Sequence, residues 1–146
     1  MNILGIDQAS HCGWCCGNDL YGEWDISTRS DESAGMKMLR FKAKLRETLE
    51  GQRIELVAYE RVAGQHKNAI IHASKMVAII ETLCEELGIN YVAFSAGEIK
   101  KFATGNGAAK KADMVKAAQE QHGYVGDNDN ICDAIFIYHY AKKLYS

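Results

Sequence analysis

Short apolar runs bounded by polar or turn-forming residues predict a β-sheet. Five such runs occur, at 2–6, 11–17, 21–27, 54–59 and 90–94. Asn18 and Asp19 suit a tight turn between the second and third runs, so the first three strands are expected to form an antiparallel meander. The first run ends at Asp7 and the fourth ends at Glu60.

Longer segments with apolar residues three or four positions apart predict helices. They cover 34–50, 67–87, 95–103, 110–122 and 130–144. In the first helix Leu39, Leu45 and Leu49 lie near one stripe. Lys42 joins that stripe, and Gly51 suits the end of the helix. Three strands followed by alternating helices and strands indicate an α/β fold in which helices cover a mixed sheet.

The segment 67–87 is too apolar for a helix that is exposed to solvent on one side. Its apolar residues cover more than one face; they are Ile70, Ile71, Ala73, Met76, Val77, Ile79, Ile80 and Leu83. A second apolar face indicates contact with a partner protein. Simple burial beneath another helix of the same chain is the alternative.

The composition fits one ordinary domain, which we place at 1–146. The chain has 146 residues, of which 47% are hydrophobic, and no proline. No apolar stretch approaches the roughly 20 residues of a membrane helix. The first residues lack the pattern of a secretory signal, so we expect a cytoplasmic protein whose five cysteines are reduced.

The net charge of −2 does not by itself indicate a nucleic-acid partner. Basic residues are nevertheless concentrated in 36–46 and 100–116, whereas acidic residues gather in 81–86 and 127–133. Solvated helix faces are the simple explanation for such runs. Contact with phosphates is the other, because it needs a basic patch and not a basic total.

The stretch HCGWCC at 11–16 raises the question of a metal or redox site. A structural zinc site needs four ligands, usually two close pairs, and no second pair is present. A redox CxxC begins a helix, whereas this one lies in a predicted strand. Side chains alternate faces along a strand, so Cys12 and Cys15 should point in opposite directions. We therefore interpret these cysteines as small packing residues.

Three carboxylates occupy positions that suggest chemistry. If the first and fourth strands are parallel neighbours, Asp7 and Glu60 end side by side, roughly 5 Å apart. Asp133 lies in a markedly apolar helix, where an unpaired charge is costly. Carboxylates that meet in this way repel one another and suit Mg²⁺ or Mn²⁺. The alternatives are strand ends that simply meet solvent and a structural salt bridge from Asp133 to a lysine.

Four segments resemble, in the same order, motifs of the RuvC-type Holliday junction resolvases, a branch of the RNase H-like superfamily. They are GIDQASHCGWCC, VAYERV, IKKFATGNGAAKKADMV and DNDNICDAIFIYHYA, which together span nearly the whole chain. The resemblance implies an RNase H-like fold with a five-stranded sheet of order 3-2-1-4-5. It also implies a homodimeric endonuclease that nicks Holliday junctions and other branched DNA with two metal ions, in DNA recombination or repair. The compact length resembles the phage-encoded members, which implies a bacterial or phage-infected host cell.

The resemblance assigns site residues by position. Asp7, Glu60 and Asp133 match the catalytic metal ligands of the family. The family often places an Asp or His three residues before the last aspartate, and this chain has Asn130 there, which brings no charge. We prefer Asp129, four residues before Asp133, as the fourth catalytic carboxylate and keep Asn130 as the alternative ligand. The expected cofactor is Mg²⁺ or Mn²⁺, two ions per site.

The resemblance also implies DNA contacts. Lys100 and Lys111 match lysines that contact DNA in the family, and Lys110 is a further candidate. The segment 105–107 should bend the chain and expose amides, and the helix that follows, from near Ala109, should offer its N-terminus to a phosphate. The basic segment 36–46 is a weaker candidate for contact with the DNA backbone.

The long helix at 67–87 resembles the dimer element of the family. Its expected interface residues are Ile70, Ala73, Val77 and Ile80. The preceding loop, 61–66, resembles the segment that reaches the centre of a junction.

Two other classes of function remain open. One is a non-catalytic DNA-binding module with the same fold. The uncharged Asn130 at an expected ligand position supports this alternative. The other is a relative of the sugar kinases and ATPases that share this sheet, although the short chain has no second lobe.

Overall fold

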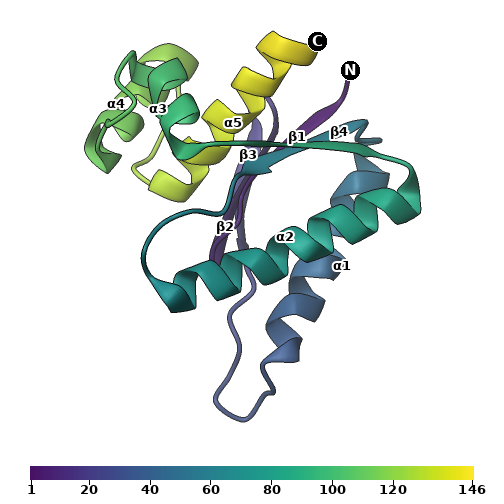
Figure 1. Cartoon of the computed structure of the whole chain (residues 1–146). Helices are drawn as coiled ribbons and strands as arrows, with labels where there is room; N and C mark the ends of the chain where they lie inside the picture. The colour runs from purple at the N-terminus through teal and green to yellow at the C-terminus, as the bar shows by residue number, and fades with distance from the viewer.

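The computed structural model describes all residues from 1 to 146 and places helices on both faces of one sheet (Figure 1). The strands are β1 (Ile3–Asp7), β2 (His11–Gly17), β3 (Leu20–Asp25), β4 (Leu56–Glu60) and β5 (Asn90–Phe94). The helices are α1 (Gly35–Gly51), α2 (Lys67–Leu87), α3 (Ala96–Thr104), α4 (Lys111–His122) and α5 (Asp129–Tyr145). The sheet order is β3-β2-β1-β4-β5, as expected.

The pairing of β1 brings two strand ends to one edge of the sheet. β1 is antiparallel to β2 and parallel to β4, and β5 extends the sheet parallel to β4. Ile6 pairs with Tyr59, so Asp7 and Glu60 follow at the same end of two neighbouring strands. This is the juxtaposition that the sequence pattern predicts.

Alternation along the strands divides the core into two halves. Leu4 and Ile6 of β1 pack on the side that α1 and α2 cover, whereas Ile3 packs on the side of α3, α4 and α5. Residues two apart share a face, so Asp7 belongs to the α5 side. The same reasoning places Glu60 there, since Leu56 and Ala58 of β4 also pack on that side.

Two glycines allow α5 to lie directly on β1 and β2. A Cβ atom at Gly5 would stand 2.7 Å from the Tyr138 backbone nitrogen, and one at Gly13 would stand 2.1 Å from the Asn130 carbonyl oxygen. Any side chain at these positions would push the helix off the sheet. The close packing fixes the first turns of α5, and with them Asp133, beside the end of β1.

The cysteines of β2 are packing residues. Cys12 lies in the half of the core under α1 and α2, and Cys15 lies in the half under α5, both buried. Burial raises the pKa of both thiols, that of Cys15 to about 12, so neither is held as a thiolate. The expectation of opposite faces is confirmed, and the stretch that contains them is a strand.

Two predictions about α1 and α2 are wrong, namely that Leu39 belongs to the buried stripe of α1 and that Ile80 of α2 lies in a dimer interface. Leu39 is 57% exposed, because the buried stripe of α1 is formed by Phe41, Leu45 and Leu49. Ile80 is fully buried in the core of its own chain, so it is not available for a dimer interface. Ile70, Ala73 and Val77 are half-buried and stay predictions for that role. None of the helices is both long and apolar enough to cross a membrane.

Candidate active site

Four carboxylates gather around the ends of β1 and β4. Asp7 is only 8% exposed, Glu60 is half-buried, and α5 brings Asp133 and, one turn earlier, Asp129. A small cavity of about 20 Å³, large enough for one water molecule, lies between Glu60, Asp133 and Lys100. The structure therefore brings together the acids that the sequence places far apart.

Gln8 holds the two strand ends together, a role that sequence reasoning missed. Its side-chain nitrogen donates to the Glu60 carbonyl, and the Glu60 backbone N–H donates to the Gln8 side-chain oxygen at 3.3 Å. Gln8 is as buried as Asp7, at 8% exposure. The available signal was a polar residue directly after a buried strand, next to the candidate carboxylate.

The acids interact strongly. Burial raises the pKa of the Asp7 carboxyl well above its usual range, and the charges of Asp133, Glu60 and Asp129 raise it further. Burial, followed by the charges of Glu60 and Asp129, raises the pKa of Asp133 to about 7. Burial also raises the pKa of Glu60, against the opposing charge of Lys100. The cluster thus holds more negative charge than its surroundings neutralise.

The donor chemistry fits a divalent cation, whereas the present side-chain positions do not enclose one. Carboxylate oxygens are the ligands that Mg²⁺ and Mn²⁺ prefer, and a cation would relieve the repulsion that raises these pKa values. However, no three histidine, cysteine, aspartate or glutamate side chains are arranged so that they could hold a metal ion. Holding one would require the carboxylates to turn toward a common point.

Asp129 and Asn130 differ in their surroundings. Asp129 begins α5, and its carboxylate lies 3.6 Å from the Lys111 ammonium group. Its charge acts on both Asp7 and Asp133. Asn130 contributes its backbone to the contact with Gly13. The electrostatics are consistent with the preference for Asp129, although which of the two is a ligand stays a prediction.

Two of the three candidate DNA-binding lysines lie beside the acids. The charge of Lys100 lowers the pKa of Glu60 and of Asp133, and Lys111 pairs with Asp129 while its side chain remains 87% exposed. Lys110 is exposed and directly precedes α4. The first two therefore adjoin the acids, and the structure shows no such contact for Lys110.

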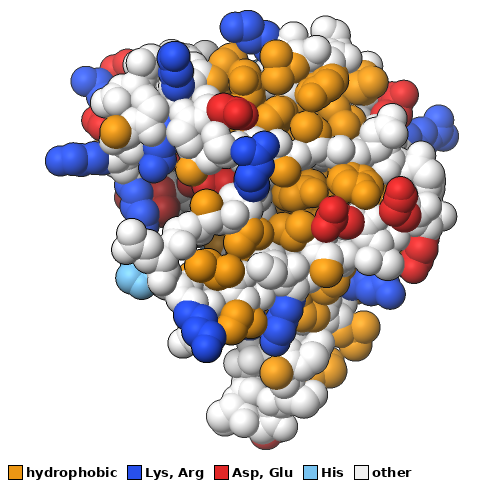
Figure 2. Space-filling model, viewed as in Figure 1, with side chains coloured by type: hydrophobic (Ala, Val, Ile, Leu, Met, Phe, Trp, Pro, Cys, Tyr) orange, Lys and Arg blue, Asp and Glu red, His pale blue; other side chains and the backbone are white.

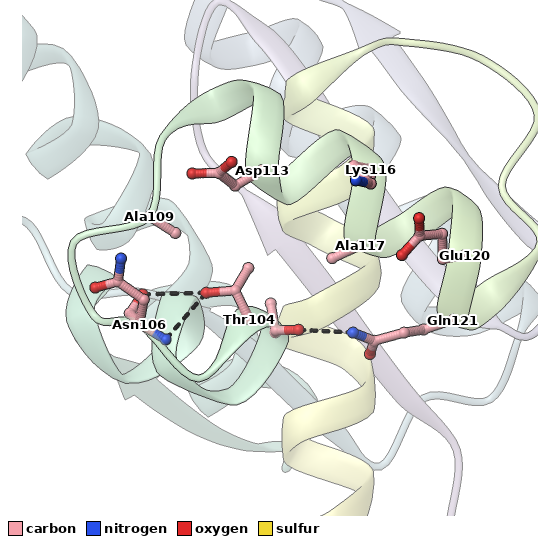
Figure 3. Close-up of a pocket in the computed structure, with 9 residues that line it drawn as sticks. Thr104, Asn106, Ala109, Asp113, Lys116, Ala117, Glu120 and Gln121 are labelled. Atoms are coloured by element: carbon pink, nitrogen blue, oxygen red, sulfur yellow. Dashed lines mark hydrogen bonds between the residues drawn. The ribbon is translucent and has the colours of Figure 1, made fainter.

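The loop before α4 is more ordered by side chains than expected. Gly105 ends α3 with a φ of 82°, as a turn-forming glycine should. The Asn106 N–H donates to the Thr104 hydroxyl at 3.1 Å (Figure 3). The Ala108 N–H donates to the Asn106 side chain at 2.9 Å. The Gly105 N–H donates to the Lys101 carbonyl, so two of the three amides of 105–107 are not free for a phosphate, contrary to expectation.

The N-terminus of α4 is less open to a phosphate than expected. The helix begins at Lys111, one residue after the start of the predicted helix 110–122, and Ala109 is buried. Asp113 lies in its first turn and accepts a hydrogen bond from the Lys110 backbone N–H at 3.0 Å. A carboxylate already occupies this positive helix end, which disfavours a phosphate there.

A second hollow of the surface shares no lining residue with the small cavity at Glu60, Asp133 and Lys100. It has a volume of about 530 Å³, between α3 and α4, and its lining includes Asp113, Lys116 and Glu120 (Figure 3). Charges of both signs line it, so it offers no single-sign field to a charged ligand. Figure 2 instead shows acidic side chains in a recess between the basic surface of α3 and α4 and the start of α2.

Comparisons with known proteins point in one direction. No family model matches the chain. A protein of Streptomyces avermitilis named crossover junction endodeoxyribonuclease RuvC is 28% identical over 123 residues, which is 78% of this chain and 70% of that protein. The protein of the same name from Streptomyces coelicolor is 28% identical over 96 residues, 65% of this chain and about half, 51%, of that relative.

Solved structures share the fold. Thermus thermophilus RuvC superimposes with a TM-score of 0.77 at 19% identity, covering 99% of this chain and 96% of that one. The same protein in complex with a Holliday junction substrate gives 0.76 at 21% identity, covering 94% and 90%. The yeast mitochondrial Holliday junction resolvase gives 0.62 at 12% identity, covering 98% and 86%.

Proposed function

We propose that the chain is a relative of the RuvC Holliday junction resolvases, whose fold it shares, and that it is a divalent-metal-dependent endonuclease that nicks Holliday junctions and other branched DNA. The observation that carries the proposal is the gathering of Asp7, Glu60 and Asp133 on one face of one sheet edge. Like charges at such a site are costly unless cations bind there.

Each carboxylate has a distinct part in the proposal. Asp7 and Glu60 would hold cations from the strand ends, and Gln8 fixes the backbone that carries Glu60. Asp133 completes the set from α5, together with Asp129 or Asn130. Two Mg²⁺ or Mn²⁺ ions bound here would activate a water molecule and stabilise the oxygen that leaves the phosphodiester.

The lysines position the DNA. Lys100 and Lys111 lie next to the acids, so a DNA phosphate held by these lysines would place the neighbouring phosphodiester of the same strand at the carboxylates. A bound phosphate would compete with Asp129 for Lys111 and free that carboxylate for a cation.

A homodimer would place two such sites on the two strands of a junction. Ile70, Ala73 and Val77 on α2 are the proposed contacts. Ile71 of the same helix is an exposed large apolar residue, as an interface requires.

The test is cleavage of a labelled synthetic four-way junction and a matched linear duplex, in Mg²⁺, in Mn²⁺ and in EDTA. The proposal expects paired nicks in the junction alone, only with metal. Asp7→Asn and Glu60→Gln should abolish cutting while binding of the junction is retained, and the exposed Asp127→Asn serves as the matched control. Normal cutting rates in both variants would overturn the assignment.

A non-catalytic DNA-binding module is the second candidate. It is favoured by the absence of any three side chains arranged around an ion and by the uncharged Asn130. A module of this kind should bind the junction without nicking it in any metal. Asp7→Asn should then bind the junction as the native chain does.

A further inference from the structure

A basic pocket lies between the starts of α1 and α2, outside the acid cluster. We call it the α1–α2 pocket; its volume is about 270 Å³, and its polar lining comprises Thr28, Lys37, Asn68, His72 and Lys75. No aspartate or glutamate lines it. A pocket with two ammonium groups and no acid favours an anion.

Both lysines of the α1–α2 pocket are free of carboxylates. Neither Lys37 nor Lys75 has an ion-pair partner within 4.0 Å, whereas Lys111 pairs with Asp129. Lys37 donates only a long hydrogen bond, at 3.4 Å, to the hydroxyl of Ser10. Their charges are therefore available to a ligand.

The contact with Ser10 places this pocket beside the candidate active site. Ser10 lies in the turn between β1 and β2, three residues after Asp7. α1 and α2 cover the face of the sheet opposite to α3 and α4 (Figure 1). The α1–α2 pocket and the Lys100–Lys111 pair thus lie on opposite faces of the sheet.

His72 supplies an unpaired polar atom. Its Nε2 atom is buried and has no hydrogen-bond partner, the only buried side-chain nitrogen or oxygen in the chain in that condition. Burial and the charges of Lys37 and Lys75 lower the pKa of the imidazole. The imidazole belongs to the lining of the pocket, so an anion held there would oppose the effect of the two lysine charges on its pKa.

Two helix starts also face the pocket. Ala34, the residue before α1, lines it, and so does Asn68, the second residue of α2. Neither helix has a side chain bonded to its first amides, and neither has an acid in its first turn. Their positive ends therefore add to the lysine charges.

We propose that the α1–α2 pocket binds a phosphate of the DNA backbone through Lys37, Lys75 and His72, so that the DNA is held on both sides of the acid cluster. The inference rests on the proposed function, because DNA is the phosphate source that it names. A free phosphate or nucleotide offers the same chemistry, and the test distinguishes the two sources.

The first arm measures binding of a labelled four-way junction in EDTA, over a range of KCl concentrations. Lys37→Ala and Lys75→Ala should each weaken binding several-fold at physiological salt and reduce the slope of log affinity against log salt by about 1. Lys142→Ala removes the same charge from an exposed position in the last turn of α5, outside the pocket and outside both basic segments, and is the matched control. It should leave the slope within error of the native value.

The second arm follows the His72 imidazole by NMR in the presence of inorganic phosphate. Phosphate should shift its signals and raise its pKa, and Lys75→Ala should weaken both effects. Junction binding by both lysine variants equal to that of Lys142→Ala overturns the proposal, and a phosphate-induced shift alongside it would reassign the pocket to a free phosphate. If the native chain neither binds nor cuts the junction, the proposed function itself has failed.

Discussion

Asp133→Asn should make the metal-free protein more stable at alkaline pH while it removes a proposed catalytic group. The substitution keeps the shape of the side chain and removes its charge. In the folded protein the Asp133 carboxyl has a pKa of about 7 instead of its ordinary 3.8, because burial and the charges of Glu60 and Asp129 oppose ionisation. A folded-state pKa above the unfolded one means that ionisation disfavours the folded state.

The sign and the pH window follow from these two values. Well below pH 4 the Asp133 carboxyl is protonated in both the folded and the unfolded state, so it does not change the free energy of unfolding. As the pH rises toward 7 the unfolded chain ionises first, so the free energy of unfolding falls, and it levels off once the folded form has ionised as well. The pKa of Asp7 is also raised, so Asp7 adds to the fall in the same direction.

The magnitude follows from the same shift. Each pH unit between the two pKa values corresponds to about 1.4 kcal/mol, which sets an upper limit of about 4 kcal/mol for Asp133. Asp133 is partly open to water, and the charges of Lys100 and Lys111 oppose the shift. We therefore expect a gain of about 2 kcal/mol at pH 8.5 in EDTA, or roughly 5 °C in Tm.

The assay is urea and thermal unfolding in EDTA at pH 5 and pH 8.5. Asp133→Asn should gain clearly more stability over the native chain at pH 8.5 than at pH 5, where the unfolded carboxyl is ionised but only part of the pH span between the two pKa values has been crossed. Added Mg²⁺ should raise the stability of the native chain more than that of the variant. Asp127→Asn is exposed and should behave as the native chain does. An equal stability difference at both pH values would refute the electrostatic account of this site.

Two further predictions concern the scaffold. Gly13→Ala places a methyl group 2.1 Å from the Asn130 carbonyl oxygen and should lower the free energy of unfolding by about 2–4 kcal/mol, whereas Gly51→Ala, which meets no neighbour, should be neutral or slightly stabilising in the same urea titration. Gln8→Met should cost about 1–3 kcal/mol, because it leaves the Glu60 backbone N–H without its partner, and should slow junction cleavage; unchanged stability would mean that water replaces the amide.

The strands and the acids could be predicted because their signals are local. Each strand appears in the sequence as an apolar run, so the residue at which it ends can be located. The carboxyl ends of parallel neighbouring strands lie at the same edge of the sheet, so Asp7 and Glu60 could be placed together from their positions alone. Asp133 was visible as a charge in an apolar helix. The order of the strands came from the resemblance to the family and is confirmed.

The errors and omissions come from tertiary contacts. Periodicity shows that α2 is apolar on two sides but not which residues its own core takes, hence the mistake about Ile80. The sequence around Gln8 does not show that its side chain joins two strand ends, because its partner Glu60 is 52 residues away. The α1–α2 pocket combines Lys37 with His72 and Lys75, and only the packing of the two helices brings them together.

The most direct test of the central claim is a titration with Mn²⁺, followed by EPR, of the native chain, Asp7→Asn and the control Asp127→Asn. The account predicts saturable binding of about two ions per chain in the native protein and in the control, and loss of that binding in Asp7→Asn. Absence of saturable binding in the native chain, or equal binding in Asp7→Asn, would contradict the assignment of these carboxylates as a metal site.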